Sequence, residues 1–265
     1  GNVEVHWGPL MSISYITLKG NMKHKKYPRK YARGYISPRY TSGPLPKFGS
    51  LTDEDLAEWH AGYDVPDLPD INFEAYKTLA QQVTDEPSGG SPEGSSYYVG
   101  NKSLKNVVDT TKRVYYITGN CDLKNSHLEG TLIVRGDLSN TGTDKGPNIL
   151  ATVPKFAWKE YQEEVNDTAA AGQYPGDLGY HNSGDGTATY NIGKTLFKGF
   201  VYISGQWSVS GNPQINGALV SIGGITGGGT PIVWYDPVPV ENVKTVSLKD
   251  LEILYWRETV PNWDL

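Results

Sequence analysis

The chain has 265 residues, of which 37% are hydrophobic, and a formal net charge of −5 at pH 7. This length allows a substantial buried core within one domain. The single cysteine, Cys121, excludes the internal disulfide framework of small secreted domains, and the sequence contains no run of 18 apolar residues that would span a membrane. Its 31 glycines, 17 prolines and 18 tyrosines favour a turn-rich β protein.

Residues 2–20 alternate between apolar and polar side chains, which predicts strands and an early turn of a repeat. The chain begins at Gly1 and runs directly into this pattern. We therefore expect that an N-terminal segment has been removed. Residues 21–50 contain four prolines and are predicted to lack regular structure, because proline supplies no amide donor to a sheet.

Charge is distributed unevenly over the first third of the chain. Residues 23–39 carry seven Lys and Arg and no acid, whereas residues 51–93 carry eleven acids and only Lys77 as a base. The favoured interpretation is that the two segments neutralise each other. The alternative is that the basic segment contacts an anionic polymer, either DNA or a polysaccharide. The candidate contact residues for that alternative are Lys25, Lys26, Arg29, Lys30 and Arg33.

Two short helices are predicted before the repeats begin. Thr52 is a suitable N-cap for a helix that ends near His60, and Asp70 for a second helix over residues 71–83. Residues 21–96 are thus expected to be a non-repetitive excursion with two helices.

Blocks of six residues that begin and end near glycine recur from residue 113 onward. Gly130 to Gly136, Gly199 to Gly205 and Gly217 to Gly223 have this form, and Arg113 to Gly119 is a degenerate fourth copy. Arg113 and Gly130 are 17 residues apart, and Gly199 and Gly217 are 18 residues apart, the length of one coil. Repeats that bury little alone but stack on one another indicate a solenoid. We therefore predict a single-stranded, right-handed parallel β-helix.

Alternate residues of each block are predicted to face opposite sides of the strand. The inward positions would stack in columns, and the first glycine of each block would lie at a corner. The expected inward residues are Tyr115, Ile117, Leu132, Val134, Val201, Ile203, Leu219 and Ser221. The expected outward residues are Thr131, Ile133, Arg135, Phe200, Tyr202 and Ser204.

An insertion interrupts the repeat at residues 151–198. It is expected to contain a helix over residues 155–171 and a loop over residues 176–190, after which turns of the solenoid resume until about Tyr235. Residues 243–265 are predicted to close the open end as a C-terminal cap. The whole chain, residues 1–265, is interpreted as a single β-helix domain.

No pattern of residues predicts catalysis, a cofactor or a metal site. Lys194 and Thr195 resemble the end of a phosphate-binding loop, but Ala188 stands where that motif needs glycine. The five histidines have no metal-ligand spacing. The outward positions carry no carboxylate pair of the kind that glycosidases use. The acids Glu160, Glu163, Glu164 and Asp167 are expected to form a solvated surface.

The repeats resemble the extracellular part of bacterial type IV pilus assembly proteins of the PilX-like kind. The resemblance lies in residues 201–224, the following VWYDP, residues 115–138, the closing YWRET and the helical stretch PDINFEAYKTLA. It implies an N-terminal hydrophobic helix, export, location in the cell envelope or outside the cell, and a structural role without catalysis. Possible partners are then other pilus or envelope proteins. A polysaccharide-active β-helix lyase or hydrolase and an intracellular self-assembling scaffold remain alternatives.

Overall fold

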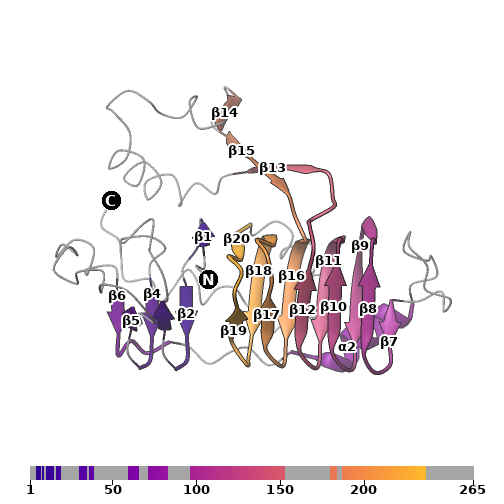
Figure 1. Ribbon diagram of the computed structural model, residues 1–265, viewed down its shortest axis with the longest axis horizontal. Coiled ribbons are helices and arrows are strands. Elements are labelled where there is room, and N and C mark those ends of the chain that lie inside the picture. The colour runs from indigo at the N-terminus through magenta and orange to yellow at the C-terminus, as the bar shows by residue number, and fades with distance from the viewer. Residues whose placement is uncertain are drawn as a thin grey trace.

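The computed structural model describes residues 4–6, 8, 10–14, 16–18, 30–34, 36–38, 59–65, 71–82, 96–152, 180–183 and 187–236. Their fold is mainly β, and parallel strands stack into a β-solenoid of about 7 turns (Figure 1). The parallel β-helix predicted from the six-residue blocks is therefore confirmed.

Two parallel sheets form the walls of the main solenoid. The seven-stranded sheet contains, in spatial order, β1 (Glu4–His6), β20 (Ile232–Trp234), β18 (Gln214–Ser221), β16 (Phe197–Ile203), β11 (His127–Val134), β9 (Val108–Ile117) and β7 (Tyr97–Tyr98). The five-stranded sheet contains β19 (Ile225–Gly227), β17 (Trp207–Val209), β12 (Leu138–Thr141), β10 (Cys121–Lys124) and β8 (Lys102–Lys105).

The six-residue blocks pair in the register that their spacing predicts. Gly130 pairs with Gly199, Gly199 with Gly217, and Arg113 with Gly130. Six of the predicted inward residues are at most 1% exposed and belong to one core, and Leu219 packs against that core. Those six are Tyr115, Ile117, Leu132, Val134, Val201 and Ile203.

The first glycine of each block was expected at a corner between strands. It lies instead within a continuous strand. Gly199 has a φ of +136°, and a Cβ there would lie 1.9 Å from the carbonyl oxygen of Gly130 in the neighbouring turn. Only glycine combines this backbone angle with so close an approach of two turns. The second glycine of each block lies in the bend between the two sheets.

The N-terminal strands extend the far end of the solenoid instead of preceding its first turn. β1 pairs in parallel with β20, and His6 stacks on Trp234 with ring centroids 3.9 Å apart. The edge of β20 is thus covered by the start of the same chain. Further short parallel strands follow: β2 (Leu10–Ser12), β4 (Lys30–Ala32) and β6 (Trp59–Ala61) in one sheet, and β3 (Ile16–Leu18) and β5 (Ile36–Pro38) in another.

Two predictions for this region are wrong. β4 and β5 lie within residues 21–50, where no regular structure was expected. β4 lies between Pro28 and Pro38 and pairs with β2, and β5 ends at Pro38 and pairs with β3. The predicted helix does not extend to His60, because His60 belongs to strand β6 and pairs with Tyr31 of β4. The start of that helix, residues 52–58, lies outside the described residues.

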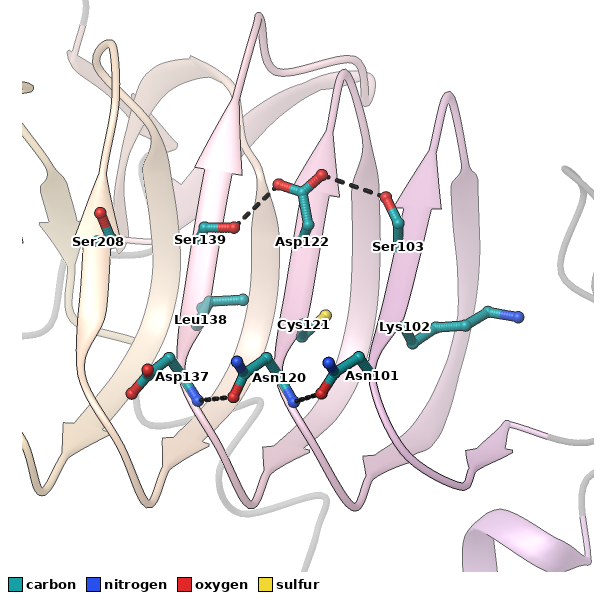
Figure 2. A pocket seen from close by; sticks show the side chains of 10 residues that line it. All are labelled: Asn101, Lys102, Ser103, Asn120, Cys121, Asp122, Asp137, Leu138, Ser139 and Ser208. Carbon is teal, nitrogen blue, oxygen red and sulfur yellow. Dashed lines mark hydrogen bonds between the residues drawn. The ribbon is translucent and has the colours of Figure 1, made fainter.

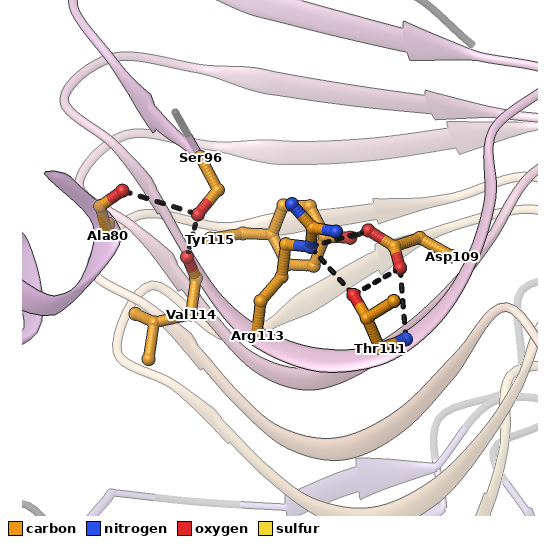
Figure 3. Close-up of polar contacts among 7 residues, drawn as sticks. All are labelled: Ala80, Ser96, Asp109, Thr111, Arg113, Val114 and Tyr115. Atoms are coloured by element: carbon orange, nitrogen blue, oxygen red, sulfur yellow. Dashed lines mark hydrogen bonds and ion pairs between the residues drawn. The ribbon is translucent and has the colours of Figure 1, made fainter. Parts of the chain in front are cut away.

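Helix α2 (Phe73–Gln81) covers part of the outer face of the seven-stranded sheet. It is the second predicted helix, but its N-cap is Asn72, not Asp70, because the Asn72 side chain accepts from the Ala75 amide (3.1 Å). At its other end, the Ser96 amide donates to the Ala80 carbonyl (3.2 Å), and the Ser96 hydroxyl lies beside it (Figure 3).

The outward residues under α2 are buried, which the sequence did not predict. Ile133 is fully buried, and Phe200 and Tyr202 are each 8% exposed, in a second core with Tyr76 of the helix. Arg135 remains exposed, with its guanidinium 3.7 Å from the centre of the Phe73 ring. The outer apolar side chains of the blocks therefore belong to an interface between helix and sheet.

The insertion begins before residue 151 and ends before residue 198, unlike the prediction, because β16 already pairs with β11 from Phe197. It contains an antiparallel sheet of β13 (Asn148–Thr152), β15 (Thr187–Lys194) and β14 (Tyr180–Ser183), which projects from the solenoid in Figure 1. The expectation of a loop over residues 176–190 is wrong where β14 and β15 pair as a hairpin. Lys194 ends a strand and no helix follows it, which agrees with rejection of the phosphate-binding motif. The predicted helix at 155–171, with its four acids, and the cap at 243–265 lie outside the described residues.

Candidate functional site

Most of the basic contact segment lies outside the part of the chain that the structure describes. Lys25, Lys26 and Arg29 belong to that undescribed part, and Lys30 is placed only as the first residue of β4. Arg33 is exposed, and its Nε donates to the carbonyl of Val65 (2.7 Å). Because the carbonyl of Val65 belongs to the backbone, this contact does not decide between the two interpretations of the basic segment, namely charge compensation by the acidic segment and binding of an anionic polymer.

The outer face of the five-stranded sheet carries a row of short polar side chains. Asp122 of β10 lies between Ser103 of β8 and Ser139 of β12, with its two carboxylate oxygens accepting from Ser103 Oγ (3.1 Å) and Ser139 Oγ (3.0 Å) (Figure 2). Ser208 and Thr226 continue the row on the next two strands in register. The row thus crosses five strands, spaced by about 4.8 Å as in any β-sheet. We call it the polar row.

Two lysines lie beside the polar row. Lys105 of β8 and Lys124 of β10 pair in register and are both exposed. Each lysine lies two residues after a member of the polar row, and alternate residues of a strand face the same side. The leucines between them, Leu104 and Leu123, are buried in the core, so both lysines project from the outer face. Like charges directly opposite each other on neighbouring strands destabilise a sheet. This pair therefore favours an anion close to both ammonium groups.

Side chains in the bends hold the edge of this face in place. Asn101 Oδ1 accepts from the amide of Asn120 (2.9 Å), and Asn120 Oδ1 accepts from the amide of Asp137 (2.9 Å) (Figure 2). Asp137 Oδ1 in turn accepts from the amide of Gln206 (2.8 Å). Each turn is thereby bonded to the next through a side chain as well as through the sheet. The result is a rigid surface.

A surface depression of about 510 Å³ lies over these strands, and residues of both the polar row and the bends line it. Cys121 is the one thiol of the chain and lies at its floor, only 2% exposed. Burial raises the pKa of this thiol to about 12. Cys121 is consequently protonated at neutral pH, which makes it unsuitable as a nucleophile.

A second polar cluster lies inside the solenoid near β9 (Figure 3). Asp109 accepts from Thr111 Oγ1 (2.6 Å) and from the Tyr115 hydroxyl, and Arg113 Nε lies 2.7 Å from its carboxylate. Burial alone raises the pKa of Asp109, but the hydrogen bonds from Thr111 and Tyr115 and the charge of Arg113 outweigh it, so the pKa is lowered. Burial and Asp109 raise the pKa of Tyr115. Because Asp109, Arg113 and Tyr115 are buried and Asp109 contacts the other three groups, we assign this cluster to stability.

A third cluster lies where the insertion joins the solenoid. His127 is fully buried; its Nδ1 donates to the Thr195 carbonyl (2.8 Å), and its Nε2 lies 3.3 Å from Glu129 Oε1. Asp144 Oδ2 accepts from the amide of Gln214 (2.9 Å), and burial raises the pKa of Asp144 to about 6. Asp144 precedes the insertion and Thr195 follows its last strand, so these contacts hold both ends of the insertion against neighbouring turns.

Within the ranges that the structure describes, no three His, Cys, Asp or Glu side chains are placed to hold a metal ion. In those same ranges, no helix has both the length and the apolar character needed to cross a membrane. Comparison of the chain with protein-family models, with curated proteins and with solved structures gives no match. The resemblance to pilus assembly proteins thus stays a prediction made from the residues alone.

Sequence reasoning did not identify the polar row or the bonded bends. The signal was the period already seen in the glycine blocks: Asn120 and Asp137, like Asp122 and Ser139, are 17 residues apart. Applied to polar residues as well as to glycines, the same spacing aligns these side chains on neighbouring turns.

Proposed function

We propose that this chain is a non-enzymatic, exported bacterial surface protein that acts in type IV pilus assembly or in adhesion. The supporting observation is the outer face of the five-stranded sheet, a rigid surface on which polar side chains repeat from turn to turn. Such a surface suits recognition of a partner, because little conformational freedom is lost on binding.

The contacts of the reactive side chains support a role without catalysis. Both oxygens of Asp122 already accept hydrogen bonds from serine hydroxyls, which positions the carboxylate as a fixed acceptor. The Asp109 carboxylate is enclosed with Arg113 and Tyr115, and the Cys121 thiol is buried and protonated. In each case the surroundings favour structural stability over proton transfer to a substrate.

Fractionation of the native organism tests the proposed location. We expect the full-length gene product in the cell envelope or outside the cell, and we expect deletion of the gene to alter pilus assembly or adhesion. A full-length product recovered in the cytoplasm, with no phenotype on deletion, would contradict the proposal and favour an intracellular scaffold.

Incubation with a panel of acidic and neutral polysaccharides tests the absence of catalysis. We expect neither new reducing ends nor unsaturated products. Product release that is lost in the Asp122→Asn variant, whose side chain is similar in size, would instead identify a polysaccharide-active enzyme with its site on this face.

A further inference from the structure

We propose that the outer face of the five-stranded sheet binds an extended acidic polysaccharide that lies across the strands. Lys105 and Lys124 would contact its carboxylates, and the polar row would contact its hydroxyls. This inference names the partner of the proposed recognition surface and rests on that proposal, but it concerns binding alone and can be tested without knowing where the protein resides.

The pair of lysines is the reason for proposing an anionic partner. Lys105 and Lys124 are exposed, point the same way and stand directly opposite each other on paired strands. Their mutual repulsion is relieved when one carboxylate approaches both ammonium groups. Asp122 is the one acid of the polar row, and it keeps its negative charge while it accepts from Ser103 and Ser139. One carboxylate against two ammonium groups leaves one positive charge unmatched, which an external carboxylate can balance.

The polar row is the reason for proposing a partner that is rich in hydroxyl groups. Ser103 and Ser139 donate their hydroxyl hydrogens to Asp122, which leaves their oxygen lone pairs free to accept from a ligand. Ser208 and Thr226 are exposed and add hydroxyl groups further along the same line. A polymer with hydroxyls on every unit can bond to such a line at several points.

The composition of this face argues against a nucleic acid. The outward positions of β8, β10, β12, β17 and β19 hold Ser, Thr, Lys and Asp. Single-stranded nucleic acids are held largely by stacking of bases on aromatic side chains. Trp207, the aromatic residue within these strands, is fully buried and bonded to Asn140 in the core. The face therefore offers charge and hydroxyl groups but no stacking platform.

Calorimetric titration of the purified chain with polygalacturonate tests the inference, with dextran as a neutral polymer and single-stranded DNA as an anionic one. We expect binding to polygalacturonate that weakens as salt is added, and much weaker binding to the other two. The double variant Lys105→Gln/Lys124→Gln should lose about tenfold in affinity, as expected for two exposed ion pairs. Its fold is checked by circular dichroism.

The matched control is Lys112→Gln/Lys194→Gln, which removes the same charge from exposed positions outside the five-stranded sheet. Its affinity should stay within about twofold of the original, since distant exposed charges are screened by salt. Equal losses in both double variants, equal affinity for dextran or DNA, or no binding to polygalacturonate would each overturn the inference. Binding as expected by a protein that fractionates to the cytoplasm would leave it standing and contradict only the proposed location.

Discussion

Replacement of Gly199 by alanine tests how closely the turns of the solenoid are stacked. Gly199 has a φ of +136°, and a new Cβ would lie 1.9 Å from the carbonyl oxygen and 2.9 Å from the carbonyl carbon of Gly130. Both obstacles are backbone atoms of a paired strand. The clash cannot be relieved by a side-chain rotation, so the two turns must separate or the strand must change its path.

The expected cost is the sum of two effects. The backbone angle costs alanine about 1–3 kcal/mol, and forcing a methyl group into a closely packed position costs about 1–3 kcal/mol more. A total of about 2–6 kcal/mol corresponds to a fall in the melting temperature of about 4–24 °C for a chain of this size.

Two control glycines separate these effects in the same thermal unfolding assay. Gly100 has a φ of +78° but nothing within 4 Å of the place that a methyl group would take, so Gly100→Ala should cost only about 1 kcal/mol from the backbone angle. Gly228 has neither obstacle, and Gly228→Ala should be neutral or slightly stabilising. If Gly199→Ala were no worse than Gly100→Ala, the close approach of Gly199 to Gly130 would be refuted.

Three further predictions concern the buried residues Leu132 and Cys121 and the half-buried Asp144. Leu132→Ala should lower the free energy of unfolding by about 2–5 kcal/mol in urea denaturation, and a loss under 1 kcal/mol would mean that Leu132 is not in the core. Asp144 has a pKa raised to about 6, so the folded state retains a proton that the unfolded state releases, and stability falls as pH rises from about 4 to 6. Asp144→Asn, which can still accept from Gln214, should therefore be more stable than the original at pH 7 and no different below pH 4; a pH-independent difference would contradict this. Cys121 should react with a thiol reagent slowly when folded and rapidly in urea, and equal rates would show that it is accessible.

The sequence was sufficient to predict the solenoid because its register is encoded locally. Gly130, Gly199 and Gly217 occupy equivalent positions along the chain, and strands in which they align must pair in parallel. The pairing of β1 with β20 could not be predicted in this way. It joins residues that lie more than 200 positions apart in the chain, and short strands such as β1 carry too few residues to specify a partner.

The candidate site was harder to predict because it consists of ordinary surface residues. Asp122, Ser139 and Lys124 become distinctive only when neighbouring turns are aligned and each side chain is assigned to the outer face. The burial of Ile133 and Phe200 was missed for a related reason. Alternation assigns these residues to the outer face, but only the path of α2 determines that this part of the face is covered.

Lysine acylation with and without polygalacturonate, read residue by residue by mass spectrometry, tests the central claim most directly. That claim is that the chain acts by recognising an acidic polysaccharide on the outer face of the five-stranded sheet. We expect bound polymer to protect Lys105 and Lys124 and to leave Lys112 and Lys194 as reactive as before. Protection of Lys112 and Lys194 with Lys105 and Lys124 unchanged would contradict it.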